Sequence, residues 1–101
     1  MLDFKKLQKE VYQNKLDKEF NVTDIPLEFA YTYGELAEAF EAYLKKKPDL
    51  GEELADVVIY VLGLAEILKI DLGKEILAKV AKNKKRKFKI VKGVRVCVKG
   101  K

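Results

Sequence analysis

Two pairs of carboxylates at helical spacing are the residues of this sequence best suited to chemistry. Glu35 with Glu38, and Glu53 with Asp56, are each three positions apart, and the basic segment 45–49 (KKKPD) lies between the pairs. Residues three apart are neighbours on one helix surface, and two helices joined by a short linker lie antiparallel. We therefore expect the four carboxylates to face one another. Such an oxygen-only set suits Mg²⁺, with Mn²⁺ as a second choice.

A lone pair of glutamates at this spacing is usually a solvated helix face, but two observations favour a site here. Glu53 and Asp56 begin a segment that is otherwise apolar, and a carboxylate in such surroundings must be paired, protonated or bound to metal. Four converging carboxylates without an arginine repel one another, and a divalent ion relieves that repulsion. Mg²⁺ keeps water or phosphate oxygens in its shell, which indicates a phosphorylated substrate, with a carboxylate as general base.

The composition argues against several other kinds of catalytic or metal site. The sequence has no histidine and a single cysteine, Cys97. Zinc, haem, iron–sulfur and Ser/His/Asp chemistry therefore lack their usual residues.

The beginning of the chain has no apolar run typical of a signal peptide. The longest apolar stretch, 57–65, is far shorter than the roughly 20 residues that cross a bilayer, so we expect a soluble cytoplasmic protein with no membrane contact.

The charges are divided unevenly along the chain. Residues 1–78 hold ten basic and sixteen acidic residues, whereas residues 79–101 hold eleven basic and no acidic ones. An acidic body with a basic tail suits an anionic ligand held by metal on one side and by lysines on the other. Two alternatives are a solvated tail and a tail that binds nucleic acid.

The apolar periodicity predicts one domain, 1–101, of four helices and a hairpin. We expect helices over about 3–18, 26–46, 50–68 and 72–86; their caps would be Thr23 or Asp24 for the second, Asp49 for the third and Asp71 for the fourth. The helical core spans about 3–87. The basic remainder, about 88–101, alternates in period two around Lys92-Gly93 and predicts a β-hairpin, which must pack on the body or on a partner.

The faces of the predicted helices indicate what each packs against. In the first, Phe4, Leu7, Val11 and Leu16 fall near one face, with Lys and Gln on the others. The second carries a broad apolar stripe: Phe29, Tyr33, Leu36, Phe40, Tyr43 and Leu44. The third is apolar on almost every face, which three other helices would hardly cover. We therefore expect a subunit interface along it.

Three blocks of the sequence resemble those of a known family. GELAEAF, GEELADVVIYVLGLAEILKIDL and KVAKNKKRK look like the motifs of the MazG-like nucleotide pyrophosphohydrolases, an all-α family related to the dimeric dUTP and dCTP pyrophosphatases. The resemblance implies a four-helix bundle assembled as a homodimer or dimer of dimers. It also implies Mg²⁺-dependent hydrolysis of a nucleoside triphosphate to the monophosphate and pyrophosphate.

The same resemblance assigns the carboxylates. Glu53 and Asp56 match the later ExxD motif of the family, and Glu35 matches a glutamate of its earlier motif. In the family a pair of glutamates precedes that position; this sequence has Tyr31 and Thr32 in their place. The ligand missing at Thr32 has two candidate replacements. One is Glu38, a metal ligand in our assignment and, with Glu53, a candidate to activate water. The other is Glu28, one turn before Thr32.

The last block and one tyrosine supply candidate substrate contacts. Lys79 and Asn83 match family positions that touch phosphates, and Arg86 would assist. Tyr60, one turn beyond Asp56, would contact the nucleotide or pack in the bundle. Two further readings stay open: a relative that binds nucleotides without hydrolysing them, and a module that binds nucleic acid through its basic tail. Against the last, the tail offers only Phe88 for stacking.

Overall fold

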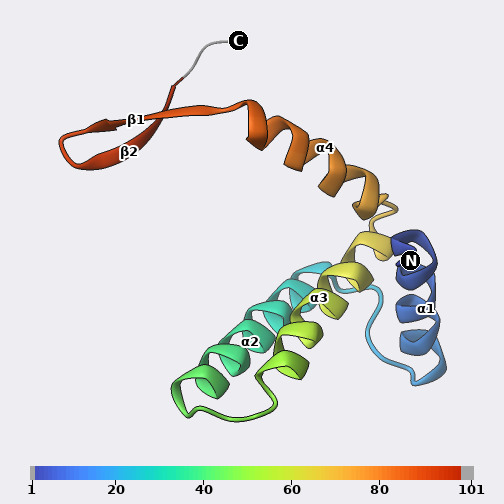
Figure 1. Cartoon of the computed structure of the whole chain (residues 1–101). Coiled ribbons are helices and arrows are strands. Elements are labelled where there is room, and N and C mark those ends of the chain that lie inside the picture. The colour runs from blue at the N-terminus through green and yellow to red at the C-terminus, as the bar shows by residue number, and fades with distance from the viewer. Residues whose placement is uncertain (1, 99–101) are drawn as a thin grey trace.

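The structure, a computed structural model, describes residues 2–98. Four helices precede an antiparallel hairpin (Figure 1), in the order α1 (Phe4–Asp17), α2 (Ile25–Leu44), α3 (Leu50–Ile67), α4 (Leu72–Lys85), β1 (Lys87–Val91) and β2 (Val94–Val98). The predicted order of elements is confirmed. Residues 1 and 99–101, which the sequence assigned to the domain and the hairpin, lie outside the described residues. Within 2–98, none of the helices combines the length and the apolar character needed to cross a membrane.

Aspartates fix the starts of three helices. Asp3, Asp24 and Asp71 each accept a hydrogen bond from the backbone N–H three residues on, which satisfies one of the unpaired donors of a helix N-terminus. Asp49 precedes α3 but forms no such side-chain bond within the described chain. The predicted N-cap position of Asp49 is therefore confirmed, but its side chain does not make the expected cap bond there.

Three helices end in the same sharp turn. Glu19, Lys46 and Lys69 follow α1, α2 and α3 with φ of 57°, 53° and 58°. In each turn the N–H of the following residue bonds the carbonyl five positions earlier, at 2.8–2.9 Å. Glycine is the usual residue in this turn because L side chains are strained at positive φ. The turn after α2 lets α3 double back beside it (Figure 1).

The core is small and lies among α1, α2 and α3. Its buried apolar residues are Ala39, Ala42, Leu62, Leu64 and Ala65. From position 28 on, the more buried positions of α2 are 28, 32, 35, 39 and 42, which recur at helical spacing. They include the edge of the helix that carries Glu28, Thr32 and Glu35. This packing aims Glu35 at α3.

The apolar stripe of α2 faces away from this core. Its six side chains are 47–73% exposed, with the extremes at Phe29 (47%) and Tyr33 (73%). We call these six residues (29, 33, 36, 40, 43 and 44) the α2 stripe. The chain by itself leaves the stripe uncovered.

α1 buries polar side chains instead of the expected leucine. Gln8 is 2% exposed and Lys15 is 8% exposed, while Leu16 is 42% exposed. Gln8 and Lys15 continue the helical spacing of Phe4 and Val11. The expectation that Lys and Gln would occupy only the outer faces of this helix is wrong for these two residues.

α4 and the hairpin form an arm (residues 72–98) that projects from the body (residues 2–71), as Figure 1 shows. α4 packs on α1 and, among the described residues, has no comparable contact with α2 or α3. The radius of gyration is 17.1 Å, against about 13 Å for a compact chain of this length. The expected four-helix bundle is therefore not closed within one chain.

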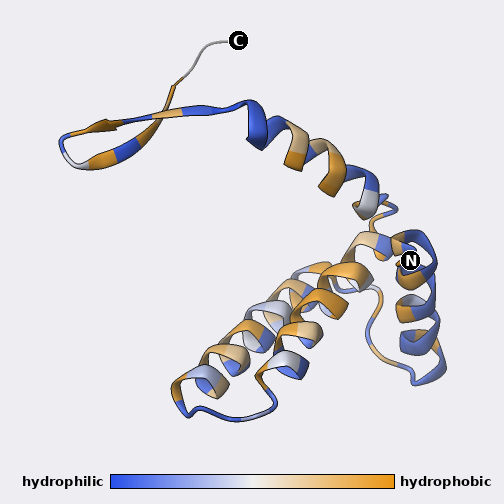
Figure 2. Ribbon diagram, in the orientation of Figure 1, coloured by the Kyte–Doolittle hydropathy of each residue, from blue (hydrophilic) through white to orange (hydrophobic). Residues whose placement is uncertain are grey.

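The hairpin turns at Lys92-Gly93, as predicted, with positive φ at both residues. Phe88 pairs with Cys97 and Lys89 pairs with Val96. Cross-strand partners share a face, so each face combines apolar side chains with basic ones. Both strands mix hydrophobic and hydrophilic residues (Figure 2), and every residue of both is exposed.

Candidate active site

The candidate site is a set of four carboxyl groups, two on α2 and two on α3. Glu35 and Glu38 come from the middle of α2, and Glu53 and Asp56 from the first half of α3. The turn at Lys46 sets the two helices side by side (Figure 1). The structure thus brings together the two pairs that the sequence singled out.

The four groups influence one another electrostatically. The pKa of Glu35 is raised to about 7, first because its carboxyl group is close enough to Glu38 to share a hydrogen bond. Burial and the negative charges of Glu38, Asp56 and Glu53 add to the rise. The pKa of Glu53 is also raised, chiefly by desolvation and then by Asp49, Glu38 and Asp56. The site therefore concentrates negative charge, and this crowding favours the protonated form of Glu35.

Basic residues do not neutralise this charge. The ion pairs of residues 2–98 are Lys5–Asp71, Lys15–Glu28 and Lys45–Glu41, and none includes a carboxylate of the site. Lys47 only partly offsets the rise at Glu53. Near Glu53, the Oδ1 atom of Asp49 is buried and has no hydrogen-bond partner in the described chain. This acceptor and the surplus charge fit a divalent cation that prefers oxygen.

The side chains are not arranged as a finished metal cage. Within residues 2–98, no three acidic side chains are close enough together to hold an ion as they stand. The Glu35–Glu38 contact supplies two groups from one helix, and the pair on α3 lies within electrostatic range of them. A bound ion would have to draw the two pairs together.

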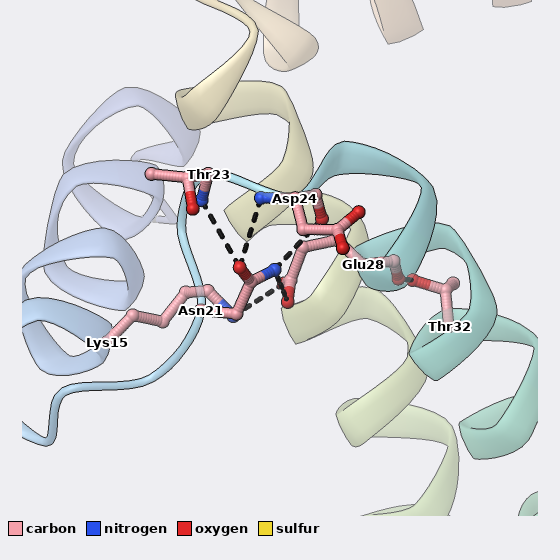
Figure 3. A network of polar contacts seen from close by, with 6 residues as sticks. All are labelled: Lys15, Asn21, Thr23, Asp24, Glu28 and Thr32. Atoms are coloured by element: carbon pink, nitrogen blue, oxygen red, sulfur yellow. Dashed lines mark hydrogen bonds and ion pairs between the residues drawn. The ribbon is translucent and has the colours of Figure 1, made fainter.

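Glu28 belongs to a different network, with Lys15, Asn21 and Thr32 (Figure 3), and it is not among the groups that raise the pKa of Glu35 or Glu53. It is 1% exposed, and its Oε1 accepts a hydrogen bond from Lys15 Nζ at 2.6 Å. Its Oε2 accepts one from Asn21 Nδ2 at 3.0 Å. Thr32 donates its hydroxyl to the main-chain carbonyl of Glu28, at 2.8 Å. Both oxygens of Glu28 are thus occupied, so its negative charge is already balanced.

The sequence reading did not find Lys15 as a partner of Glu28. One signal was available: Lys15 continues the helical spacing of Phe4, Gln8 and Val11, and a lysine aligned with apolar positions is a candidate for a buried ion pair, because it is not stable there alone. Glu28 carried no such signal, because the apolar stripe of α2 lies on another face of that helix.

A pocket lies beside the carboxylates, around Tyr60. It has a volume of about 370 Å³, and the residues that line it are Lys15, Phe20, Asn21, Glu28, Tyr31 and Tyr60. The Tyr31 and Tyr60 rings meet edge to face at 6.2 Å, and Lys15 Nζ lies 5.3 Å from the centre of the Tyr60 ring. Burial, followed by the charges of Glu35 and Glu28, raises the pKa of Tyr60. Tyr60 is therefore a phenol that can donate a hydrogen bond next to the carboxylates.

The predicted phosphate contacts are not at this site in the single chain. Lys79 and Asn83 lie on α4, and Arg86 is its C-cap residue. Because α4 packs on α1, the arm carries these side chains away from the pairs on α2 and α3 (Figure 1).

Comparison with known proteins identifies the family. Residues 28–91 match the family model described as the MazG nucleotide pyrophosphohydrolase domain. The match covers most of α2 and all of α3, α4 and β1, and so includes both carboxylate pairs and the basic part of α4. No match was found among curated proteins or among solved structures. The chain belongs to the MazG nucleotide pyrophosphohydrolase family.

Proposed function

We propose that this protein is a Mg²⁺-dependent pyrophosphohydrolase that converts nucleoside triphosphates to monophosphates and pyrophosphate. The observation that carries the proposal is the set of four carboxyl groups on α2 and α3, which lie within electrostatic range of one another and form no ion pair in the described chain. Membership of the family supports the same activity.

Glu35, Glu38, Glu53 and Asp56 would hold the ion. Their donor atoms are all oxygens, and the unpaired Asp49 Oδ1 nearby offers a further acceptor. When bound, Mg²⁺ supplies positive charge that stabilises the phosphates and assists the deprotonation of water. Mn²⁺ has the same ligand preference and is a second candidate.

In this proposal Glu38 replaces the metal ligand that is missing at Thr32. Glu28 already balances its charge with Lys15 and bonds Asn21, so recruiting it would leave a buried ammonium unpaired, which is costly. Glu38 is close enough to Glu35 to share a proton with it. Glu38 and Glu53 are the groups that would accept a proton from the attacking water.

The pocket at Tyr60 would receive the nucleoside. It adjoins the carboxylates, because the charges of Glu35 and Asp56 act on Tyr60, and it offers aromatic edges together with polar groups. Lys79 and Asn83 would bind the phosphates once brought to the site. We propose a homodimer or dimer of dimers, because one chain leaves the α2 stripe and its own α4 uncovered.

The direct experiment is measurement of pyrophosphate release from several nucleoside triphosphates with Mg²⁺, with Mn²⁺ and with chelator. The proposal predicts metal-dependent release of one pyrophosphate per monophosphate. Binding of nucleotides without any release would instead favour the non-hydrolysing relative, which the missing glutamate at Thr32 suggests.

A further inference from the structure

The hairpin at the end of the arm cannot be stable in isolation. Every residue of β1 and β2 is exposed, and a two-stranded hairpin alone is marginal in water. Its large apolar side chains lie open to solvent, with Phe88 at 51%, Ile90 at 69% and Val94 at 61% exposure. An ordered hairpin of this composition needs another surface to cover it.

The corner between α3 and α4 prevents the body of the same chain from supplying that surface. The buried side-chain amide of Gln8 donates to the Ile70 carbonyl and accepts from the Leu72 N–H, both at 2.9 Å. At Gly73, the space for a Cβ is already filled by Phe4, whose own Cβ would be 3.0 Å away. These contacts hold the start of α4 against α1 and fix the direction of α4.

The rest of the arm continues in that direction. α4 has 14 residues, which at 1.5 Å per residue is about 21 Å of rigid helix. Only Arg86 separates α4 from β1, and its backbone is extended. The hairpin is thus held away from its own body (Figure 1), and another molecule must cover it.

The body of a second copy has the charge that complements the arm. The arm holds ten basic residues and one acidic residue, whereas the body (2–71) holds nine basic and fifteen acidic residues. Opposite net charges steer two such surfaces together.

The second copy also has the matching apolar surface. The α2 stripe is exposed. Its residues Leu36, Phe40 and Tyr43, together with Leu50 and Leu54 of α3, line an apolar groove of about 320 Å³ between α2 and α3. The hairpin presents branched aliphatic side chains and one aromatic, Phe88. Non-specific binding of single-stranded nucleic acid relies on several aromatic platforms, so the composition favours a protein surface.

We propose that the hairpin of one copy packs on the α2 stripe of a second copy, and that the second copy's hairpin packs on the first in return. Such an exchange is a two-fold interface. It carries Lys79 and Asn83 toward the carboxylates of the other copy; this consequence, unlike the docking itself, rests on the proposed function.

The test uses the full chain with a photoreactive phenylalanine analogue in place of Phe88. A one-to-one mixture of ¹⁴N- and ¹⁵N-labelled chains is irradiated, and the cross-linked peptides are identified by mass spectrometry. We expect mixed-isotope cross-links that join the hairpin to residues 25–44. The same analogue in place of Gln13, on the outer face of α1, is the matched control and should give no such cross-links.

The two variants Ile90→Asp and Ile90→Val complete the design. Sedimentation should show that Ile90→Asp weakens self-association about tenfold or more, while Ile90→Val leaves it nearly unchanged. Helical content from circular dichroism should be the same in both. Three results would each overturn the proposal: cross-links confined to one isotope, cross-links only to other surfaces, or a wild-type chain that is monomeric. So would chain-to-chain cross-links that vanish after nuclease treatment. None of these readouts requires hydrolysis, so a failure here is distinct from a failure of the proposed activity.

Discussion

Lys15 Nζ lies 2.6 Å from Glu28 Oε1, in a contact where the two side chains are only 9% and 1% exposed. The pair joins α1 to α2, and Asn21 in the connection between them completes the bonding of Glu28. A buried ion pair of this kind is costly to break from one side, because the remaining charge is left without water or a partner.

Lys15→Met should therefore destabilise the protein by about 3–5 kcal/mol. The double variant Lys15→Met/Glu28→Leu should recover much of that loss, since no charge is left behind. Urea unfolding followed by circular dichroism measures both. A single variant as stable as the wild type would contradict the burial of this pair.

The raised pKa of Glu35 predicts how stability depends on pH. In the unfolded chain the carboxyl has its ordinary pKa of 4.5, and in the folded state about 7. The folded state thus binds the proton more tightly, and its stabilising effect, complete below about pH 4.5, is lost as the pH rises through 7. The melting temperature of the metal-free protein should fall across this range, and less so in Glu35→Gln. A melting temperature with the same pH dependence in both proteins would contradict this account.

The affinity for Mg²⁺ should move in the opposite direction. Glu35 must lose its proton before it can bind the ion, so affinity should rise as the pH passes through about 7. Calorimetric titration at pH 6 and pH 8, in buffers of different ionisation enthalpy, would also count the proton released. Equal affinities at the two pH values would exclude Glu35 as a ligand.

Thr32→Glu tests the interpretation of the missing ligand. The new carboxylate would lie one turn before Glu35 on the same buried edge of α2, where the family has a glutamate. It should tighten Mg²⁺ binding and lower stability in the absence of metal, because it adds charge to a crowded site. Thr32→Gln has nearly the same size and is the control for bulk. Equal Mg²⁺ affinity in the two variants would show that position 32 does not face the ion.

Replacing a lysine by glycine in one of the turns that follow the helices should raise the free energy of unfolding. Lys46 and Lys69 have φ of 53° and 58°, a conformation that strains an L residue by roughly 1–2 kcal/mol but leaves glycine, which has no Cβ, unstrained. Lys69→Gly should stabilise the protein by about 0.5–1 kcal/mol after the larger entropy of the unfolded glycine is subtracted. Lys69→Ala keeps the strain and is the matched control. A glycine variant no more stable than the alanine variant would contradict the strained turn.

The helices and the carboxylate pairs follow from local signals in the sequence. Apolar periodicity, the Asp24 and Asp71 caps and the Lys92-Gly93 turn are properties of short segments, and they predicted the elements correctly. To predict that the ExxE pair and the ExxD pair lie on neighbouring helices, it was enough to see that the linker is short, because a short linker makes the two helices antiparallel.

The tertiary arrangement could not be predicted in the same way. Which face of α2 meets α3 depends on small residues such as Ala39 and Ala42, which permit close packing, and not on the larger apolar stripe. The roles of Gln8 and Lys15 depend on partners 62 and 13 positions away. The direction of the arm depends on the hydrogen bonds of Gln8 to Ile70 and Leu72, and periodicity, which predicts the helices one by one, does not give that direction.

The measurement that tests the central claim most directly is Mg²⁺-dependent pyrophosphate release by Asp56→Asn, compared with Glu41→Gln. Asp56 belongs to the carboxylate set on α2 and α3, whereas Glu41 is exposed and paired with Lys45 outside it. We predict that Asp56→Asn abolishes release while its circular dichroism spectrum is unchanged, and that Glu41→Gln is as active as the wild type. Full activity in Asp56→Asn would contradict the assignment of the site.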